Sequence, residues 1–363
     1  MIDSLHQFQD RVKQLISFLD DAEAINALSS AINSENEDKF SSIKPSHLTR
    51  FDRLKFNTIN RKIQTYASGI VLLYGLFEQY VEEIMVAFLE ELDSTISNFD
   101  DIPEKIRENH TNLSAQLLIN RNLDKYRERC NETEIIQRMH LCSHGSPFRL
   151  NAVAFTDHKS NFRIESLNRF FELAGVSGIS TLVKKTANFQ QYSALKFPNQ
   201  SIDDLPDKVV FEDLDDLAWR RNVVAHGWPD DTLSIEMMKE RAEFIRILGM
   251  CIYNSLRQNL LPHIIKHQCQ ALSKPLAVYN SSIVCFHMEE GSIVKGSQII
   301  ACRSGGYLEG EVIEIEINHV QQTQVTAPPS VDVACLVNFK AKDNYRYFIR
   351  KATKDNRPDV IIE

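Results

Sequence analysis

The sequence predicts a mainly α-helical chain that ends in a small β domain. Up to about residue 268, apolar residues recur three and four positions apart, which is the spacing of amphipathic helices. After about residue 270, short runs of β-branched and aromatic residues alternate with Gly, Ser and Pro, which is typical of strands and turns. The 363 residues are 43% hydrophobic and 25% charged, so the chain can bury enough apolar surface for two globular domains.

We divide the chain into an N-terminal helix with a polar linker at 1–54, a helical domain at 55–268 and a β domain at 270–363. The first helix is expected over residues 1–28, where the apolar residues follow helical spacing. These residues are Leu5, Phe8, Val12, Leu15, Ile16 and Leu19. Residues 29–47 are polar and rich in serine, which predicts a loop.

Two long helices are expected in the helical domain. The first covers roughly 53–95, where a continuous apolar stripe runs from Ile70 to Leu92. The second covers about 234–267 and has Ser234 as its candidate N-cap.

The segment between the long helices is less regular. Residues 104–140 are mixed and polar, and we expect them to be helical with breaks. Residues 141–200 show short aromatic patterns, which indicate loops with one or two short helices. This region carries seven Lys or Arg and three acids, whereas residues 201–218 carry seven acids and one lysine. The acids lie mainly where the next helix begins, and carboxylates stabilise the first turn of a helix.

The β domain is expected to be a barrel or a sandwich of about five or six strands. Turn residues separate the candidate strand segments. These segments are "AVYNSSIVCFHM", "SQIIACR", "EGEVIEIEINHV", "VDVACLVNFKA" and "RYFIRK".

The helix expected at about 209–226 has an arginine on its apolar stripe. The other members of the stripe are Val210, Leu214, Leu217, Val224 and Trp228. Arg221 lies in the middle and has only apolar residues three and four positions away, whereas Arg220 follows Asp216 by four and is expected to form a surface ion pair. Because a buried guanidinium without a partner is costly, we expect Arg221 to meet an acid of another helix, a subunit interface or a ligand anion.

Asn222 and His226 are four residues apart and therefore share a helix face, which the long Arg221 side chain can reach. A guanidinium, a carboxamide and an imidazole together suit phosphodiester chemistry. Arginine binds a phosphate through two parallel hydrogen bonds, and histidine transfers a proton near neutral pH. Asparagine can orient either the imidazole or a ribose.

The stretch "RNVVAH", Arg221 to His226, resembles the R-x4–6-H signature of HEPN ribonucleases. The stretch "YGLFEQYVEEI" at 74–84 resembles the first core helix of the MAE-type and RiboL-PSP-linked HEPN subgroups. The stretch "HKSNFRIESLNRFFELAGV" at 158–176 resembles a segment that these subgroups carry before the motif. The resemblance spans roughly 55–268 and does not include the β domain.

The resemblance implies a helical bundle that forms a homodimer and cuts RNA without a metal ion or cofactor. The ribose 2′-hydroxyl would attack the neighbouring phosphate and leave a 2′,3′-cyclic phosphate and a 5′-hydroxyl. Arg221 would hold the scissile phosphate, Asn222 would orient, and His226 would transfer a proton. The resemblance also implies a role in a toxin–antitoxin or anti-phage defence system, with an antitoxin or another defence protein as partner.

Two alternatives stay open. The first is a catalytically inactive HEPN-like protein that binds or scaffolds the components of a defence complex. The second is a helical adaptor whose activity resides in the β domain. Glu78 is a supporting candidate that could orient His226 or pair with Arg221, and a solvated position on the helix is the alternative.

The basic residues of 141–200 are candidate RNA contacts: Arg149, Lys159, Arg163, Lys184 and Lys185. Four aromatic residues in the same region could stack on bases or could instead belong to the core. They are Phe148, Phe155, Phe162 and Tyr192.

Several other classes are disfavoured. The formal net charge of −8 argues against broad coating of duplex nucleic acid, and neither a G-x-x-x-x-G-K-[ST] nor a G-x-G-x-x-G motif is present. The spacing of His140, Cys142 and His144 does not match a usual zinc motif, so we expect no metal site. Seven scattered cysteines, and the lack of a signal peptide or membrane span, lead us to expect a cytoplasmic protein.

Overall fold

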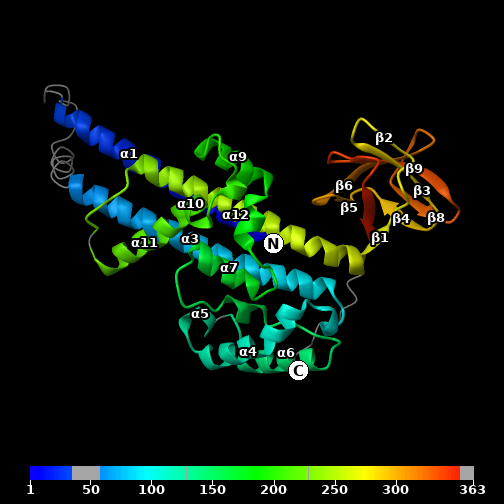
Figure 1. The fold of residues 1–363 in the computed structure, drawn as a ribbon, viewed down its shortest axis with the longest axis horizontal. Helices are drawn as coiled ribbons and strands as arrows, with labels where there is room; N and C mark the ends of the chain where they lie inside the picture. Colours follow the sequence, from blue (N-terminus) through cyan, green and yellow to red (C-terminus); the bar gives the residue numbers. More distant parts are fainter. Residues whose placement is uncertain (35–57, 128, 228, 352–363) are drawn as a thin grey trace, which may run out of the picture. The chain divides into compact units, whose positions relative to one another are not determined.

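The computed structural model describes residues 1–34, 58–127, 129–227 and 229–351. Figure 1 shows helices up to about residue 268 and strands after it, as the sequence predicts. The chain divides into two compact units, which we describe separately. The helical unit contains Met1–Glu91 and Asn98–Leu256, and the β unit contains Leu92–Ser97 and Arg257–Glu363.

The long helices form where the apolar periodicity predicts them. They are α1 Ile2–Ser34, α3 Thr58–Thr95, α11 Glu212–His226 and α12 Ile235–Gln268. The Ser234 hydroxyl caps α12 by accepting a hydrogen bond from the Met237 amide at 3.2 Å. The helix α1 continues to Ser34, beyond its predicted end, and the rest of the predicted linker lies outside the described residues.

Close packing joins α1, α3 and α12. The Phe8 ring stacks on the Tyr80 ring with their centroids 4.3 Å apart, and the Tyr80 hydroxyl donates to the Gly249 carbonyl at 2.8 Å. Burial raises the pKa of Tyr80 well above its ordinary value. A Cβ atom at Gly249 would lie 2.4 Å from the Phe8 ring, so this approach requires glycine.

The middle of the chain contains more helix than the sequence predicts. Short helices and single turns follow one another between α3 and α11, and three of the helices fall within 141–200. They are η2 Phe99–Asp101, α4 Glu104–Asn120, α5 Asp124–Arg127, α6 Glu132–Ser143, η3 Ala152–Thr156, α7 Ile164–Glu172, α8 Ile179–Lys184, α9 Ala187–Lys196, η4 Ile202–Asp204 and α10 Asp207–Val210. Within the described ranges, every helix is too short or too polar to cross a lipid bilayer.

The described part of the β unit is an antiparallel, curled sheet that forms a half-barrel, together with a separate two-stranded ladder. The strand order is β1-β10-β5-β6-β9-β3-β2, with β7 on β6, and β4 pairs with β8. The strands are β1 Cys269–Ala271, β2 Ala277–Tyr279, β3 Ile283–Met288, β4 Gly291–Val294, β5 Gln298–Arg303, β6 Gly306–Ile317, β7 Val320–Gln322, β8 Gln324–Ala327, β9 Val331–Val337 and β10 Arg346–Arg350.

The long strand β6 lets the sheet curl. Its first half pairs with β5 and its second half pairs with β9, and the register shifts between Val312 and Glu314. Such a bulge bends a strand and increases its twist. The strands number ten in the described residues, more than predicted, because ladders of three or four residues are too short to show a period of two.

Candidate active site

The two adjacent arginines of α11 do not lie as the sequence predicts. Arg220 is the buried one, with 9% of its surface exposed, and Arg221 is half-buried. The Arg220 guanidinium donates to Asp216 at 2.9 Å and to the Tyr66 hydroxyl at 3.1 Å, and it pairs with Asp231 at 3.2 Å. The expected pair with Asp216 is therefore present, but it is largely buried and is not a surface pair.

Position along the helix explains why Arg221 is only half-buried although it lies on the apolar stripe. Leu214 and Leu217 in the first turns of α11 are buried, whereas His226 at its end is exposed. Apolar spacing gives the angle of a side chain around the helix axis, but it does not show where the helix leaves the core. Arg221 lies at this transition, and Trp228 of the predicted stripe lies outside the described residues.

The Arg221 guanidinium is held by an aromatic ring and an amide. Its central carbon lies 5.5 Å from the centroid of the Tyr74 ring, a cation–π distance. It also donates to the Asn222 Oδ1 at 3.4 Å. No carboxylate among the described residues pairs with Arg221, so its charge is not neutralised within the described chain.

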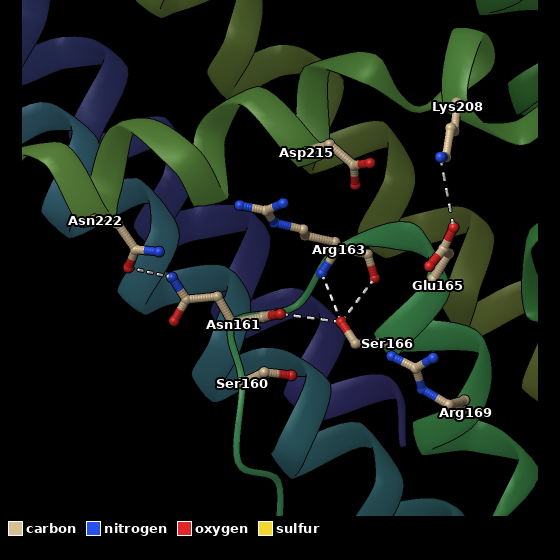
Figure 2. Close-up of a pocket in the computed structure, with 9 residues that line it drawn as sticks. All are labelled: Ser160, Asn161, Arg163, Glu165, Ser166, Arg169, Lys208, Asp215 and Asn222. Carbon is tan, nitrogen blue, oxygen red and sulfur yellow. Dashed lines mark hydrogen bonds and ion pairs between the residues drawn. The ribbon is translucent and has the colours of Figure 1, made fainter.

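Asn222 is fixed from a second segment. Its Oδ1 accepts a hydrogen bond from the Asn161 Nδ2 at 2.7 Å, and the same Nδ2 donates to the Ala218 carbonyl at 3.3 Å. Figure 2 shows this amide pair between α11 and the loop before α7. The contact was not predicted, since the two asparagines are 61 residues apart.

His226 is the last residue of α11 and is exposed. Its imidazole forms no hydrogen bond with another described residue. The structure thus leaves both ring nitrogens accessible to a ligand or a second chain.

Tyr74 supports Arg221, and Glu78 supports Tyr74. The Tyr74 hydroxyl donates to the Glu78 Oε1 at 3.3 Å and accepts from the Phe162 amide at 2.8 Å. Burial raises the pKa of Tyr74, and the Glu78 charge raises it further, so the phenol stays protonated at neutral pH. Glu78 also lies 3.8 Å from the His158 imidazole, and among the described residues it forms no hydrogen bond or ion pair with Arg221 or His226.

A buried carboxylate that the sequence analysis missed lies one turn beyond Glu78. Glu82 is 8% exposed and pairs with Lys125 at 2.8 Å, His158 at 3.0 Å and Arg129 at 3.4 Å. Burial alone would raise the pKa of Glu82, but the hydrogen bonds from His158 and Lys125 outweigh it and hold the pKa below its ordinary value. The sequence contained a signal for this site, because Glu82 is an acid inside the buried apolar stripe of α3.

A polar cleft of about 580 Å³ lies between α11 and the segment that begins α7. Figure 2 shows its lining residues converging from the two sides. They are Ser160, Asn161, Arg163, Glu165, Ser166, Arg169, Lys208, Asp215 and Asn222.

Of the five predicted RNA contacts, Arg163 lines the cleft. Lys184 is 6% exposed, pairs with Asp207 at 2.6 Å and donates to the Leu205 carbonyl at 2.8 Å, so its ammonium is engaged within the chain. Lys159 and Lys185 are exposed and Arg149 is half-buried, and none of these three lines the cleft.

The aromatic candidates belong mainly to the core. Phe148, Phe155 and Phe162 are all buried, which excludes base stacking on these rings in this conformation. Tyr192 is half-buried, and its hydroxyl donates to Asp213 at 3.4 Å.

In the His140–Cys142–His144 stretch, the two imidazole rings lie with their centroids 4.2 Å apart, but the thiol does not join them. Cys142 is buried and donates to the Arg149 carbonyl at 3.2 Å, while His140 and His144 are exposed. The described residues contain no group of three or more His, Cys, Asp or Glu side chains suited to hold a metal ion.

A helical unit with an Arg–Asn pair, and a histidine five residues after the arginine at the end of the same helix, corresponds to a HEPN-type protein. The sequence model of the family described as RiboL-PSP-HEPN matches residues 7–258. The chain therefore belongs to the RiboL-PSP-HEPN family, which confirms the resemblance inferred from the sequence. The match begins within α1 and ends within α12, and no curated protein matches the chain significantly.

Proposed function

We propose that this protein is a metal-independent RNA endonuclease with Arg221, Asn222 and His226 as its catalytic residues. The observation that carries the proposal is the Arg221 guanidinium, which lies over Tyr74 and beside Asn222 without a carboxylate partner among the described residues. A guanidinium held in this way can pair with a phosphate through two parallel hydrogen bonds. Family membership supports the proposal, because HEPN domains are often ribonucleases.

In the proposed reaction, the ribose 2′-hydroxyl attacks the adjacent phosphorus and the bond from phosphorus to the 5′-oxygen breaks. A base takes the proton of the 2′-hydroxyl, and an acid gives a proton to the leaving 5′-oxygen. An imidazole can carry out either transfer near neutral pH, and Arg221 stabilises the charge that develops on the phosphate. The products are a 2′,3′-cyclic phosphate and a 5′-hydroxyl.

A homodimer supplies one His226 for each proton transfer. The face of α11 that carries this residue is partly exposed and partly apolar. Its members at helical spacing are Trp219, Asn222, Val223 and His226. Trp219 is 49% exposed, and Val71 and Leu72 on α3 are 44% and 51% exposed. Exposed apolar side chains on the two helices that form the site support the pairing of two copies here.

A toxin–antitoxin or anti-phage defence role, with an antitoxin or another defence protein as partner, completes the proposal. The second candidate function is a catalytically inactive HEPN protein that scaffolds such a complex. The observation that favours it is the exposed His226 imidazole, which no other described residue orients.

Replacing His226 with alanine separates the two functions. We expect the purified full-length variant to cleave end-labelled RNA at least about 100-fold more slowly than the unaltered protein, because general acid–base catalysis is lost. The assay contains EDTA, so that no metal ion contributes to cleavage. The products of the unaltered protein should carry a 2′,3′-cyclic phosphate and a 5′-hydroxyl.

The matched control is His6→Ala, since His6 is also an exposed helical histidine but lies on α1. It should cleave at the rate of the unaltered protein. Equal cleavage by His226→Ala and by the unaltered protein would exclude the proposed mechanism.

A further inference from the structure

The cleft beside Asn222 contains two arginines with free guanidinium groups. Arg163 and Arg169 are both exposed and both line the cleft. Within the described residues, neither side chain forms a hydrogen bond or an ion pair. In Figure 2 the Arg163 side chain extends toward α11, whereas the Arg169 guanidinium lies on the Ser166 side.

The acids of the cleft form no ion pair with these arginines within the described residues. The Asp215 carboxylate accepts a hydrogen bond from the Ile164 amide at 2.9 Å, and Glu165 lies 4.0 Å from the Lys208 ammonium. The lining has three cations and two acids, a local charge of +1, in a chain whose formal net charge is −8. The cleft therefore favours an anion, although the molecule as a whole does not.

The helix end in the cleft does not provide the binding groups. The Ile164 amide at the start of α7 is taken by Asp215, and the Arg163 amide donates to the Ser166 hydroxyl at 2.8 Å. Recognition of an anion here depends on the two guanidinium groups.

The cleft is continuous with the proposed catalytic residues. Asn222 lines the cleft, and its carboxamide is also contacted by the Arg221 guanidinium at 3.4 Å. Asn161 on the other side holds Asn222 at 2.7 Å. A volume of about 580 Å³ falls within the range of small-molecule sites, so a nucleotide can enter.

We propose that this cleft binds single-stranded RNA next to the cleavage site, with Arg163 and Arg169 pairing with backbone phosphates and the Asn161–Asn222 amides facing the nucleoside. The inference rests on the proposed function, because it places the flanking nucleotide beside the phosphate that Arg221 holds. The two arginines then guide the strand and set its register relative to His226.

Binding to an uncleaved strand tests the cleft independently of catalysis. The experiment measures the fluorescence anisotropy of a short labelled single-stranded RNA with the full-length His226→Ala protein. Adding Arg163→Gln and Arg169→Gln together should weaken binding at least tenfold. The two lost phosphate contacts should reduce the slope of log affinity against log salt by about 1.4, at about 0.7 per contact.

The matched control in the same background is Lys13→Gln with Lys105→Gln, which removes two exposed cations of the helical unit outside the cleft. We expect this pair to change affinity by less than about twofold. All four side chains are exposed, so unfolding temperatures should stay unchanged, and circular dichroism checks this.

The outcomes separate the cleft from the catalytic proposal. Arginine-dependent binding with no cleavage by the unaltered protein would support the cleft as an RNA site and count against the endonuclease. Normal cleavage, with equal RNA affinity in the arginine variant and its background, would overturn the cleft proposal alone.

Discussion

At the scale of single residues, Glu82 shows how the chain makes a buried charge tolerable. A carboxylate at 8% exposure costs several kcal/mol unless it is paired. Its partners Lys125, Arg129 and His158 all come from segments other than α3. The carboxylate therefore attaches α5 and the loop that carries Asn161 to the long helix.

We predict that Glu82→Gln destabilises the helical unit by about 1–3 kcal/mol at pH 7, because Lys125, Arg129 and His158 lose their shared carboxylate acceptor. The loss is moderated because Lys125 and Arg129 are partly solvated. Since the pKa of Glu82 is lowered on folding, its contribution is complete above the unfolded value and is lost as the pH falls through the folded value. Urea unfolding followed by tryptophan fluorescence measures the difference from the unaltered protein. That difference should shrink as the pH falls below the ordinary carboxyl value of 4.5 and through the lowered folded value.

Glu90→Gln is the control, because Glu90 is an exposed acid on the same helix. It should change the free energy of unfolding by less than about 0.5 kcal/mol at either pH. A Glu82→Gln effect that stayed constant from neutral to acidic pH would contradict the ionised network.

A residue's role can be predicted from the sequence when the contacts that determine it are made with near neighbours in the chain. Arg221, Asn222 and His226 could be picked out because their spacing on one helix is written in the sequence. The burial of Lys184 could not, because it depends on Asp207, which is 23 positions away and contacts it only in the fold. Charge counting finds a basic region but does not distinguish a free cation from a paired one.

At the scale of elements, the long helices were predictable and the short ones were not. The long helices α3 and α12 span 38 and 34 residues, whereas α7 and α8 span nine and six residues. Distant side chains stabilise their first turns, since Asp215 accepts from the Ile164 amide and Asn168 accepts from the Ser180 amide at 2.9 Å. Such caps are tertiary contacts and leave no local pattern.

The approach of α1 to α12 gives an element-scale prediction. Gly249→Ala should destabilise the helical unit by about 1–3 kcal/mol, because the added Cβ meets the Phe8 ring at 2.4 Å and the stacked Tyr80 limits its movement. The free energy of unfolding in urea measures this change. Adding Phe8→Leu should recover part of the loss, because the smaller side chain can move aside.

Gly75→Ala on α3 is the matched substitution of opposite sign. A Cβ atom at Gly75 meets nothing within 4 Å, so replacing glycine in a helix interior should stabilise by up to about 1 kcal/mol. Similar effects of the two substitutions would mean that α1 does not pack against Gly249 as the structure has it.

At the scale of the whole molecule, the family match and the compact helical unit end at nearly the same residue. The match ends at residue 258 and the compact helical unit ends at Leu256. The proposed catalytic residues and the RNA cleft all lie inside the helical unit. The fold class of the β unit was predictable from its strand composition, but no residue pattern there indicates a chemical task.

The proposed dimer gives the prediction that belongs to this scale. The mass in solution, measured by light scattering, should be twice the 41.7 kDa of one chain. Leu72→Glu or Trp219→Glu should yield monomers, because a charge would replace apolar surface that a second copy covers. Since one chain carries one His226, the monomeric variants should also lose at least about 90% of the cleavage rate.

Leu195→Glu is the control for these variants, because Leu195 on α9 is 84% exposed and lies away from the α11 motif in sequence. It should remain dimeric and active. A monomeric Leu72→Glu protein that cleaves RNA at the full rate would show that one chain carries a complete site. His226 of a single chain would then have to serve as both base and acid in successive steps, and the exposed stripe of α11 would need another explanation.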